Sequence, residues 1–534
     1  MTTRAIATHR VVAHLDLDAF YCQVERRDLR AKTAAGRRDG RASAEDVPLV
    51  VVQYNPFERG GVRALAPDDD RELRDGFENH SLIAVSYEAR ARGVKRNMRG
   101  REARALAPAC AVVQVPTRRS KADLTLYREA GREVAAVLAR GGTIERASID
   151  EAYLDLTESA KKVLEETAWA TILEKARTSH AAGASAVSGK GYASVAWWNR
   201  DESEWREEEK LLAAGAYICF NLRKACVDEL GYTLSAGIAL NKMLAKLTSG
   251  MNKPASQTVL CPDHTSTLLD ELPIDRIRGL GAKFGRELAD GLNVKTIGEL
   301  ARTPLRKLEE VCGEEKAQWV RKVSLGLDDD PVKAREMPKS IGTGKTFRGA
   351  LAIRSIASAK HWLAELTAEL NDRCEADEEE WNRVPKLLTL GLSSPDERET
   401  SSGHCSRRCP LRPGADEMAQ DALTLLSKWA SGRERWSITG MSVSASNFVS
   451  LEKDSGDVVE MFKNATKAAK APASVSATPA ASPIKADQID KNVLAELPEA
   501  IQREIRASMG LLDKSTGGGV KRKNEITNYF SKKR

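Results

Sequence analysis

The sequence of 534 residues has no long apolar run and no pattern of paired cysteines. No stretch approaches the roughly 18 consecutive apolar residues of a membrane-spanning helix, and the opening MTTRAIATHR lacks the apolar core of a signal peptide. Nine cysteines are scattered without a repeated CxxC spacing, which argues against a disulfide framework. We therefore expect an intracellular protein in a reducing compartment, with no membrane partner.

One group of cysteine and histidine residues falls short of a zinc site. His404, Cys405 and Cys409 lie close together in the sequence, but no second pair of ligands follows nearby. A structural zinc ion needs about four ligands. We interpret this stretch as a loop with free thiols.

Positive charge is modest in total and uneven in distribution. The formal net charge of +7 is too small for this chain length to indicate a nucleic-acid partner by itself. Two stretches are nevertheless crowded with basic residues: Arg90, Arg92, Lys95, Arg96, Arg99, Arg101 and Arg104, and Lys521, Arg522, Lys523, Lys532, Lys533 and Arg534. Such clusters favour a phosphate-rich partner, although a solvated basic face would also explain the first.

The first third of the chain alternates apolar runs with helical patterns. The run RVVAHLDLDAFYCQVE predicts a buried strand that ends in Asp16 and Asp18 and leads into a helix, and VPLVVVQY predicts a second buried strand. The polar segment Asn55–Ser81 predicts a loop, which we expect to point outward. KADLTLYREAGREVAAVLAR is typical of an amphipathic helix.

The remaining pattern indicates further α and β modules, so we predict an α+β multidomain protein. YTLSAGIALNKMLAKLTSG predicts a strand, a turn and a helix, and IRGLGAKFGRELADGLNVKTIGELA predicts a helix-hairpin-helix that could offer backbone N–H groups to a phosphate. Residues 335–450 alternate strands with helices. The composition of residues 451–485 shifts to Ala, Ser, Pro and Lys, which predicts a disordered linker.

Three acids at predicted strand ends suggest a metal site. In IERASIDEAYLDL, Asp150 and Glu151 are neighbours on a predicted strand, so one would face solvent and the other would point inward. Asp16 ends another strand. Carboxylate oxygens suit Mg²⁺ or Mn²⁺, and two such ions about 4 Å apart can activate a hydroxyl and stabilise a leaving pyrophosphate. Alternatively, each acid merely caps a strand end.

A second group of residues could neutralise a triphosphate. Its members carry cationic or hydrogen-bonding side chains near predicted turns: Gln53, Tyr87, Arg90, Arg96 and Lys242. Arg and Lys form charge-assisted hydrogen bonds with phosphate oxygens. Surface arginines are usually solvated, so this spacing alone does not decide between the two interpretations.

Four stretches within residues 10–450 resemble the Y-family of translesion DNA polymerases: LDLDAFY, AVSYEARARGVKR, IERASIDEAYLDLT and SAGIALNKMLAKLTSGMNKP. VVQY together with IERASIDEAY is most similar to the eta-type branch, with kappa- and iota-like branches as alternatives. The resemblance implies a right-hand polymerase with palm, fingers and thumb, a little-finger domain and a disordered C-terminal tail. The expected ranges are palm 1–19 and 123–250, fingers 20–122, thumb 251–330, little finger 335–450 and tail 451–534.

The resemblance also implies roles for individual residues. Asp16, Asp150 and Glu151 match the metal-binding catalytic carboxylates, and Leu17 stands where a backbone carbonyl also touches metal. Tyr21 matches the aromatic steric gate that excludes a ribose 2′-hydroxyl. The triphosphate contacts correspond to Tyr87, Arg90 and Lys242, the residues over the bases correspond to Gln53 and Arg96, and Ser148 has a supporting role that the sequence does not specify.

The implied activity is template-directed, error-prone DNA synthesis past UV-damaged bases such as thymine dimers. The cofactor would be two Mg²⁺ ions, with Mn²⁺ as an alternative, and the substrates would be primer–template DNA and a dNTP. Two other functions stay open: a catalytically silent translesion scaffold, against which the retained acids count, and a nucleotide cyclase, which would not need a helix-hairpin-helix.

Two tail segments carry signals of their own. DQIDKNVLAELPEAIQREI resembles, over 490–505, the ubiquitin-binding motif of translesion polymerases, with Leu497, Pro498 and Ile501 as its core. KRKNEITNYFSKKR resembles, over 523–530, a sliding-clamp (PCNA) interaction box with the apolar anchors Ile526, Tyr529 and Phe530. Lys523 stands where that box usually has Gln, which predicts weaker docking. We expect monoubiquitinated clamp and ubiquitin as partners, and a nuclear location from the basic residues.

Overall fold

A computed structural model describes residues 10–34, 47–57, 64–66, 69, 71–73, 76–182, 194–334, 337–347, 349–395 and 403–451. All of these belong to one compact unit, Met1–Leu451. The predicted linker and both tail motifs, with Leu497, Pro498, Ile501, Ile526, Tyr529 and Phe530, lie outside the described residues.

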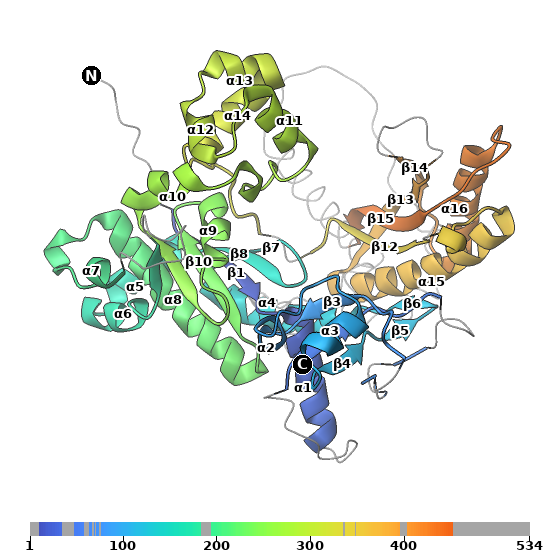
Figure 1. Cartoon of the computed structure of the whole chain (residues 1–534), viewed down its shortest axis with the longest axis horizontal. Helices are drawn as coiled ribbons and strands as arrows, with labels where there is room; N and C mark the ends of the chain where they lie inside the picture. Colours follow the sequence, from blue (N-terminus) through green and yellow to red (C-terminus); the bar gives the residue numbers. More distant parts are fainter. Residues whose placement is uncertain are drawn as a thin grey trace, which may run out of the picture. The chain divides into compact units, whose positions relative to one another are not determined.

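The apolar run at the start of the chain forms a central strand of a six-stranded sheet (Figure 1). The strand order is β7 (Thr143–Arg146), β8 (Glu151–Asp155), β1 (Val12–Leu17), β10 (Leu234–Ala239), β11 (Gln257–Leu260) and β9 (His180–Ala182). Strand β1 is antiparallel to both neighbours, and its burial on both faces explains its nearly continuous apolar sequence. Strand β11 lies in the range predicted as thumb, a boundary that composition alone did not reveal.

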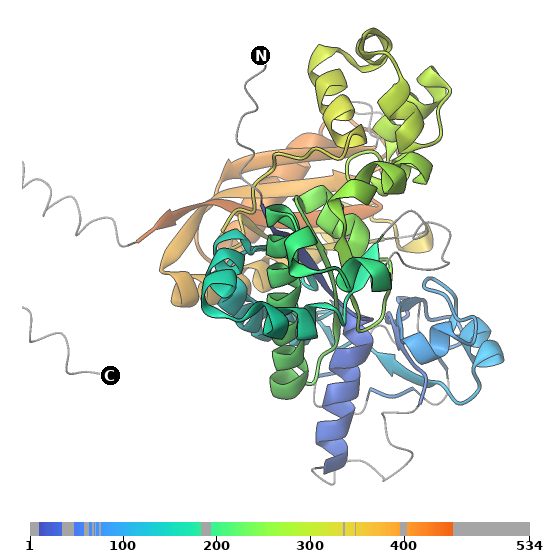
Figure 2. The same ribbon diagram turned by 90° about the vertical axis from the view of Figure 1, so that its left-hand side faces the viewer.

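Helices α4 (Thr125–Leu138), α7 (Ser194–Trp198), α8 (Glu207–Leu230) and α9 (Lys242–Ser249) pack against this sheet. Helices α5 (Thr157–Glu166) and α6 (Trp169–Ala176) pack on α8, and α1 (Phe20–Ala34) packs on α4. The long helix α8 lies along the sheet in both views (Figures 1 and 2), and its Leu212 and Ala216 are buried in one cluster with Leu15 of β1 and Tyr127 of α4. The predicted strand-to-helix and amphipathic-helix segments are confirmed.

A smaller three-stranded sheet follows, in the order β3 (Leu82–Val85), β2 (Leu49–Val52) and β4 (Ala111–Gln114), with helices α2 (Tyr87–Arg90) and α3 (Gly100–Leu106) and a hairpin of β5 (Thr117–Arg118) and β6 (Lys121–Ala122). The described part of Asn55–Ser81, predicted to point outward, is only partly exposed. Leu65, Arg71 and Phe77 are only 7%, 2% and 1% exposed, because backbone pairing with strand β4 and the residues after it draws the segment inward.

A helical cluster contains the predicted helix-hairpin-helix. Its helices are α10 (Thr265–Glu271), α11 (Lys283–Leu292), α12 (Ile297–Arg302), α13 (Leu305–Cys312) and α14 (Glu314–Ser324). Gly279 adopts a φ of +96° in the turn before α11, a conformation that favours glycine. The cluster buries Leu288, Leu300 and Leu308, and Figure 2 shows it as a compact group.

The last described module is a four-stranded antiparallel sheet with two helices. The strand order is β12 (Ser340–Thr346), β15 (Gly440–Ser450), β13 (Arg383–Ser393) and β14 (His404–Pro410), and the helices are α15 (Ile356–Trp381) and α16 (Ala415–Ala430). The loop predicted around His404, Cys405 and Cys409 is instead edge strand β14, with both cysteines free. Its polar side chains hid the alternation in which Cys405 is buried.

Within the part of the chain that the structure describes, no helix is both long enough and apolar enough to cross a membrane.

Candidate active site

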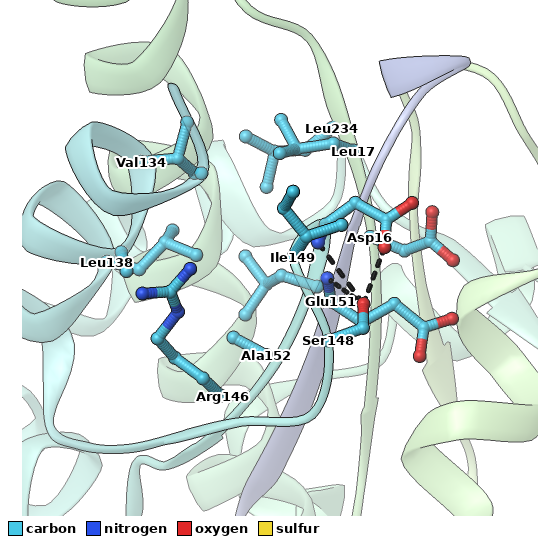
Figure 3. Close-up of a pocket in the computed structure, with 14 residues that line it drawn as sticks. Asp16, Leu17, Val134, Leu138, Arg146, Ser148, Ile149, Glu151, Ala152 and Leu234 are labelled. Carbon is cyan, nitrogen blue, oxygen red and sulfur yellow. Dashed lines mark hydrogen bonds between the residues drawn. The ribbon is translucent and has the colours of Figure 1, made fainter. Parts of the chain in front are cut away.

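Strand pairing brings the predicted acids together. Asp16 on β1 is the register partner of Glu151 on β8, and the Leu17 backbone N–H donates to the Asp150 carbonyl at 3.0 Å. Figure 3 shows Asp16 and Glu151 at the edge of a small pocket whose other side is lined by Val134, Leu138 and Arg146. The two sequence motifs therefore meet at one end of the central strands, as a site built by the fold requires.

Asp150 belongs to a turn and not to the strand. Strand β8 begins at Glu151, so the expectation that one acid points inward and its neighbour outward does not apply, and both are half-buried. Ser148 fixes the turn: its hydroxyl accepts from the backbone N–H groups of Asp150 and Glu151 at 3.2 and 3.0 Å and donates to the Asp150 carboxylate (Figure 3). This is the supporting role that the sequence left unspecified.

Two lysines neutralise the acids. The Lys253 ammonium forms an ion pair with Asp16, and Lys246 Nζ lies 2.8 Å from Glu151 Oε2. Burial raises the pKa of Asp16, and Lys253 opposes that rise. The pKa of Glu151 is held well below its usual range, first by His14, whose Nε2 lies 3.7 Å away, and then by Lys246. The acidic edge is therefore partly desolvated and attracts cations.

The donor atoms at this edge suit a hard divalent cation. Among the described residues, no group of three or more His, Cys, Asp or Glu side chains is gathered closely enough to hold a metal ion. Carboxylate oxygens are nevertheless the ligands that Mg²⁺ and Mn²⁺ prefer. Asp16 and Glu151 are of this chemical type, and each is paired with a lysine ammonium in this structure.

The sequence motifs assigned no role to Lys246 or Lys253, although both lie in SAGIALNKMLAKLTSGMNKP. The buried Asp18 fixes the segment around Lys253, because its carboxylate accepts from Ser235 Oγ and from the Ala255 backbone N–H, each at 2.8 Å. Lys246 follows Lys242 by four residues, so both lie on one face of α9. That spacing was the available signal for Lys246.

Lys242, predicted to contact the triphosphate, lies apart from the acidic edge. Its ammonium donates to Glu145 Oε2 at 2.9 Å and to Asp330 Oδ2 at 2.6 Å, and its side chain is only 4% exposed. It also lies 5.0 Å from the centroid of the Tyr153 ring. A lysine held this way is occupied by structural partners.

Tyr21 lies in the first turn of α1. Its ring packs against Tyr127 with centroids 4.1 Å apart. Burial raises the pKa of the Tyr21 hydroxyl, and the negative charge of Asp150 adds to this, while Arg128 and Arg96 oppose it. Asp150 and Arg96 therefore both act electrostatically on the predicted steric gate.

Tyr87 and Arg90 are held by the short helix α2. Its N-cap, Ser86, accepts from the Ala89 backbone N–H at 3.4 Å, and the Arg90 guanidinium stacks on the Tyr87 ring at 4.5 Å. Burial raises the pKa of Tyr87, and the carboxylates of Asp18 and Asp16 raise it further. Asp16 and Asp18 therefore act electrostatically on the Tyr87 hydroxyl.

Gln53 lines a wide cleft rather than the acidic pocket. Its backbone N–H donates to the Ser81 carbonyl at 2.9 Å. The cleft also contains the basic side chains Arg99, Arg101, Lys121 and Lys345. All seven basic residues predicted as a cluster between Arg90 and Arg104 are exposed. This surface suits an anionic partner longer than a single nucleotide.

Comparison with known proteins identifies related sequences along most of the chain. Residues 15–250 match the impB/mucB/samB family, residues 338–458 match the C-terminal domain of that family, and residues 272–327 match a motif described as DNApol eta/Rev1, HhH motif. The helix-hairpin-helix prediction and the family resemblance of the sequence motifs are confirmed by these matches.

Individual relatives agree with the family models. The chain is 38% identical over 475 residues to DNA polymerase eta of Arabidopsis thaliana and 33% identical over 481 residues to DNA polymerase eta of Drosophila melanogaster. Each match covers 85% of this chain, but 66% and 51% of the relatives. DNA polymerase iota of Mus musculus is 29% identical over 76% of the chain and 47% of the relative. The chain thus spans about half to two thirds of these relatives.

Proposed function

Because this chain belongs to the Y-family of DNA polymerases, we propose that it is a DNA-directed DNA polymerase of the eta type that copies templates past UV-damaged bases such as thymine dimers. The observation that carries the proposal is the pairing of Asp16 with Glu151, with Asp150 in the adjoining turn and Tyr21 nearby. Its substrates are primer–template DNA and a dNTP.

The modules take the parts of a right hand. The six-stranded sheet is the palm, the three-stranded sheet the fingers, helices α10–α14 the thumb, and the four-stranded sheet with α15 and α16 the little finger. Strand β11 extends the palm to Leu260. The basic cleft lined by Arg99, Arg101 and Lys345 then offers a path for the template.

Family membership implies use of a divalent metal, and we assign Mg²⁺ to the acidic edge. Asp16, Asp150, Glu151 and the Leu17 carbonyl would hold two ions. When bound, such ions lower the pKa of an attacking hydroxyl and stabilise a leaving pyrophosphate. Ser148 keeps the Asp150 carboxylate in place, and the pairing of β1 with β8 fixes the remaining two acids.

The incoming nucleotide lies between the fingers helix and the acidic edge. Tyr87 and Arg90 bind the triphosphate, and Lys253 replaces Lys242 as the lysine of this group, since its ammonium reaches the acidic edge and can pass from Asp16 to a phosphate once a metal binds the acid. Gln53 and Arg96 lie over the template and incoming bases. The Tyr21 ring, supported by Tyr127, excludes a ribose 2′-hydroxyl.

Two motifs in the tail bind protein partners. Leu497, Pro498 and Ile501 bind ubiquitin, and Ile526, Tyr529 and Phe530 dock on the sliding clamp, PCNA, in the nucleus; the sequence motifs support both assignments. Deletion of residues 520–534 leaves synthesis without the clamp unchanged and removes stimulation by the clamp. Equal stimulation of the truncated and full-length proteins would contradict the clamp assignment.

Primer extension with Mg²⁺ and dNTPs tests the catalytic proposal. Templates with and without a thymine dimer are compared, and the Asp150→Ala variant serves as the inactive control because it retains the DNA-binding surfaces. Insertion of two adenines opposite the dimer supports an eta-type enzyme. A stall at the dimer with normal extension elsewhere would move the chain to another branch, such as the iota type of its Mus musculus relative. No extension on either template would indicate a scaffold.

A further inference from the structure

The described part of the segment between Asn55 and Ser81 adds backbone pairing to the edge of the three-stranded sheet. The Gln114 N–H donates to the Arg71 carbonyl at 2.9 Å, and the Leu73 N–H donates to the Val112 carbonyl at 2.8 Å. These bonds fix the backbone on both sides of Glu72, which bridges to Val113. The position of the Arg71 side chain is therefore set by strand β4.

Arg71 forms a buried, two-pronged ion pair with Glu25 of α1. Its two terminal nitrogens lie 2.7 Å from the two carboxylate oxygens, and the side chains are 1% and 0% exposed. Arg71 also donates to the Gln114 carbonyl at 3.0 Å and to Asp28 at 3.3 Å. Parallel bonds of this kind fix orientation as well as charge.

Glu25 connects this ion pair to the packed aromatic rings of Tyr127 and Tyr21. The Tyr127 hydroxyl donates to Glu25 Oε1, and the fully buried Tyr127 ring packs on Tyr21 with centroids 4.1 Å apart. Tyr21 and Glu25 are also one helical turn apart on α1. A contiguous chain of contacts thus runs from the segment through Arg71, Glu25 and Tyr127 to Tyr21.

We propose that Arg71 is a positioning residue for sugar selection, acting through Glu25 and Tyr127 on the ring of Tyr21. This inference rests on the proposed role of Tyr21 as the gate against a ribose 2′-hydroxyl. A gate that rejects one oxygen atom depends on placement within about half an ångström. The segment that carries Arg71 therefore takes part in substrate choice, beyond its contribution to the sheet edge.

Single-nucleotide insertion by the full chain tests this inference. The ratio of kcat/KM for dATP to that for ATP is measured opposite an undamaged thymine. Arg71→Met should lower this ratio roughly tenfold, the scale of a small misfit in a binding pocket. Tyr127→Phe keeps the ring and removes only the hydroxyl, so this variant should fold more readily than Arg71→Met. It should also lower the ratio. An unchanged ratio in Tyr127→Phe would overturn the inference even if Arg71→Met did not fold.

Arg383→Met is the matched control. Arg383 makes an equivalent buried pair with Asp377, with two nitrogen–oxygen distances of 2.7 Å, in the four-stranded module. Arg383→Met should lower the unfolding temperature about as much as Arg71→Met does, without changing the dATP-to-ATP ratio of kcat/KM. If Arg383→Met lowered that ratio as much as Arg71→Met, the Arg71 effect would be general destabilisation and the inference would be overturned.

Tyr21→Ala distinguishes the proposed gate role of Tyr21 from the proposed positioning role of Arg71. An unchanged ratio in this variant would overturn the gate itself and the inference with it. A lowered ratio in Tyr21→Ala, together with an unchanged ratio in folded Arg71→Met, would overturn only the role of Arg71.

Discussion

Helix α9 carries two lysines one turn apart that meet two different acidic regions. Lys242 pairs with Glu145 of β7, and these side chains are 4% and 7% exposed. Lys246 pairs with Glu151 of β8, and these side chains are 36% and 27% exposed. The same residue types thus form a closed pair in one place and an accessible pair in the other.

The difference in exposure indicates that the buried ion pair has a structural role and the accessible pair a functional one. A desolvated pair depends on both partners, because removing one leaves an uncompensated buried charge. An accessible pair contributes little stability and can exchange its ammonium for another cation. We therefore attribute folding to the Lys242–Glu145 pair and chemistry to the edge formed by Asp16 and Glu151.

The largest expected effect is a loss of kcat when glutamine replaces the glutamate of the accessible pair. The same substitution in the closed pair should not cause this loss. Glu151→Gln should lower kcat by at least about 10³-fold, since a lost metal contact removes several kcal/mol of transition-state stabilisation. Glu145→Gln should keep kcat per folded molecule. Single-turnover nucleotide addition, normalised to folded protein, measures both. Equal losses of kcat in the two variants would break the distinction.

Removal of the buried lysine should affect stability most. Lys242→Met removes the buried ammonium that contacts Glu145 and Asp330, at an expected cost of about 3–5 kcal/mol in the free energy of unfolding. Chemical denaturation of the full chain provides the measurement. A cost below about 1 kcal/mol would show that the closed pair is not structural.

Removal of the lysine beside Asp16 should affect nucleotide binding instead. Lys253→Met should raise KM for the dNTP roughly tenfold, equivalent to one lost charge-assisted hydrogen bond, with little change in stability. Steady-state insertion kinetics of Lys253→Met and Lys242→Met, compared side by side, test the exchange of roles between the two lysines. A larger KM effect in folded Lys242→Met would restore the original assignment.

The smallest expected effect is the stabilisation of the folded chain by Mg²⁺ without DNA or nucleotide. Mg²⁺ at five times its dissociation constant should stabilise the full chain by about 1 kcal/mol, because it binds only the folded state. Thermal unfolding with and without Mg²⁺ detects this shift, and Asp150→Ala should abolish it. The same shift in both proteins would place the ion elsewhere.

The sequence by itself determined the central strands, the amphipathic helices and the family, because apolar periodicity and contiguous motifs are local properties. It also indicated Asp16, Asp150 and Glu151, since acids interrupting a buried run are conspicuous. The loop predicted at 404–409 was wrong, and the partial burial of the segment 55–81 was not foreseen, because edge pairing by polar segments leaves little trace in composition.

Only the tertiary structure decided which charges meet. Lys242 and Lys253 look equivalent in the sequence, yet one is enclosed by Glu145 and Asp330 while the other reaches Asp16. Likewise, no local pattern links Arg71 with Glu25 across 46 positions. The energy of an ion pair depends on desolvation and on partners distant in the chain, and these are fixed only once the strands and helices have packed.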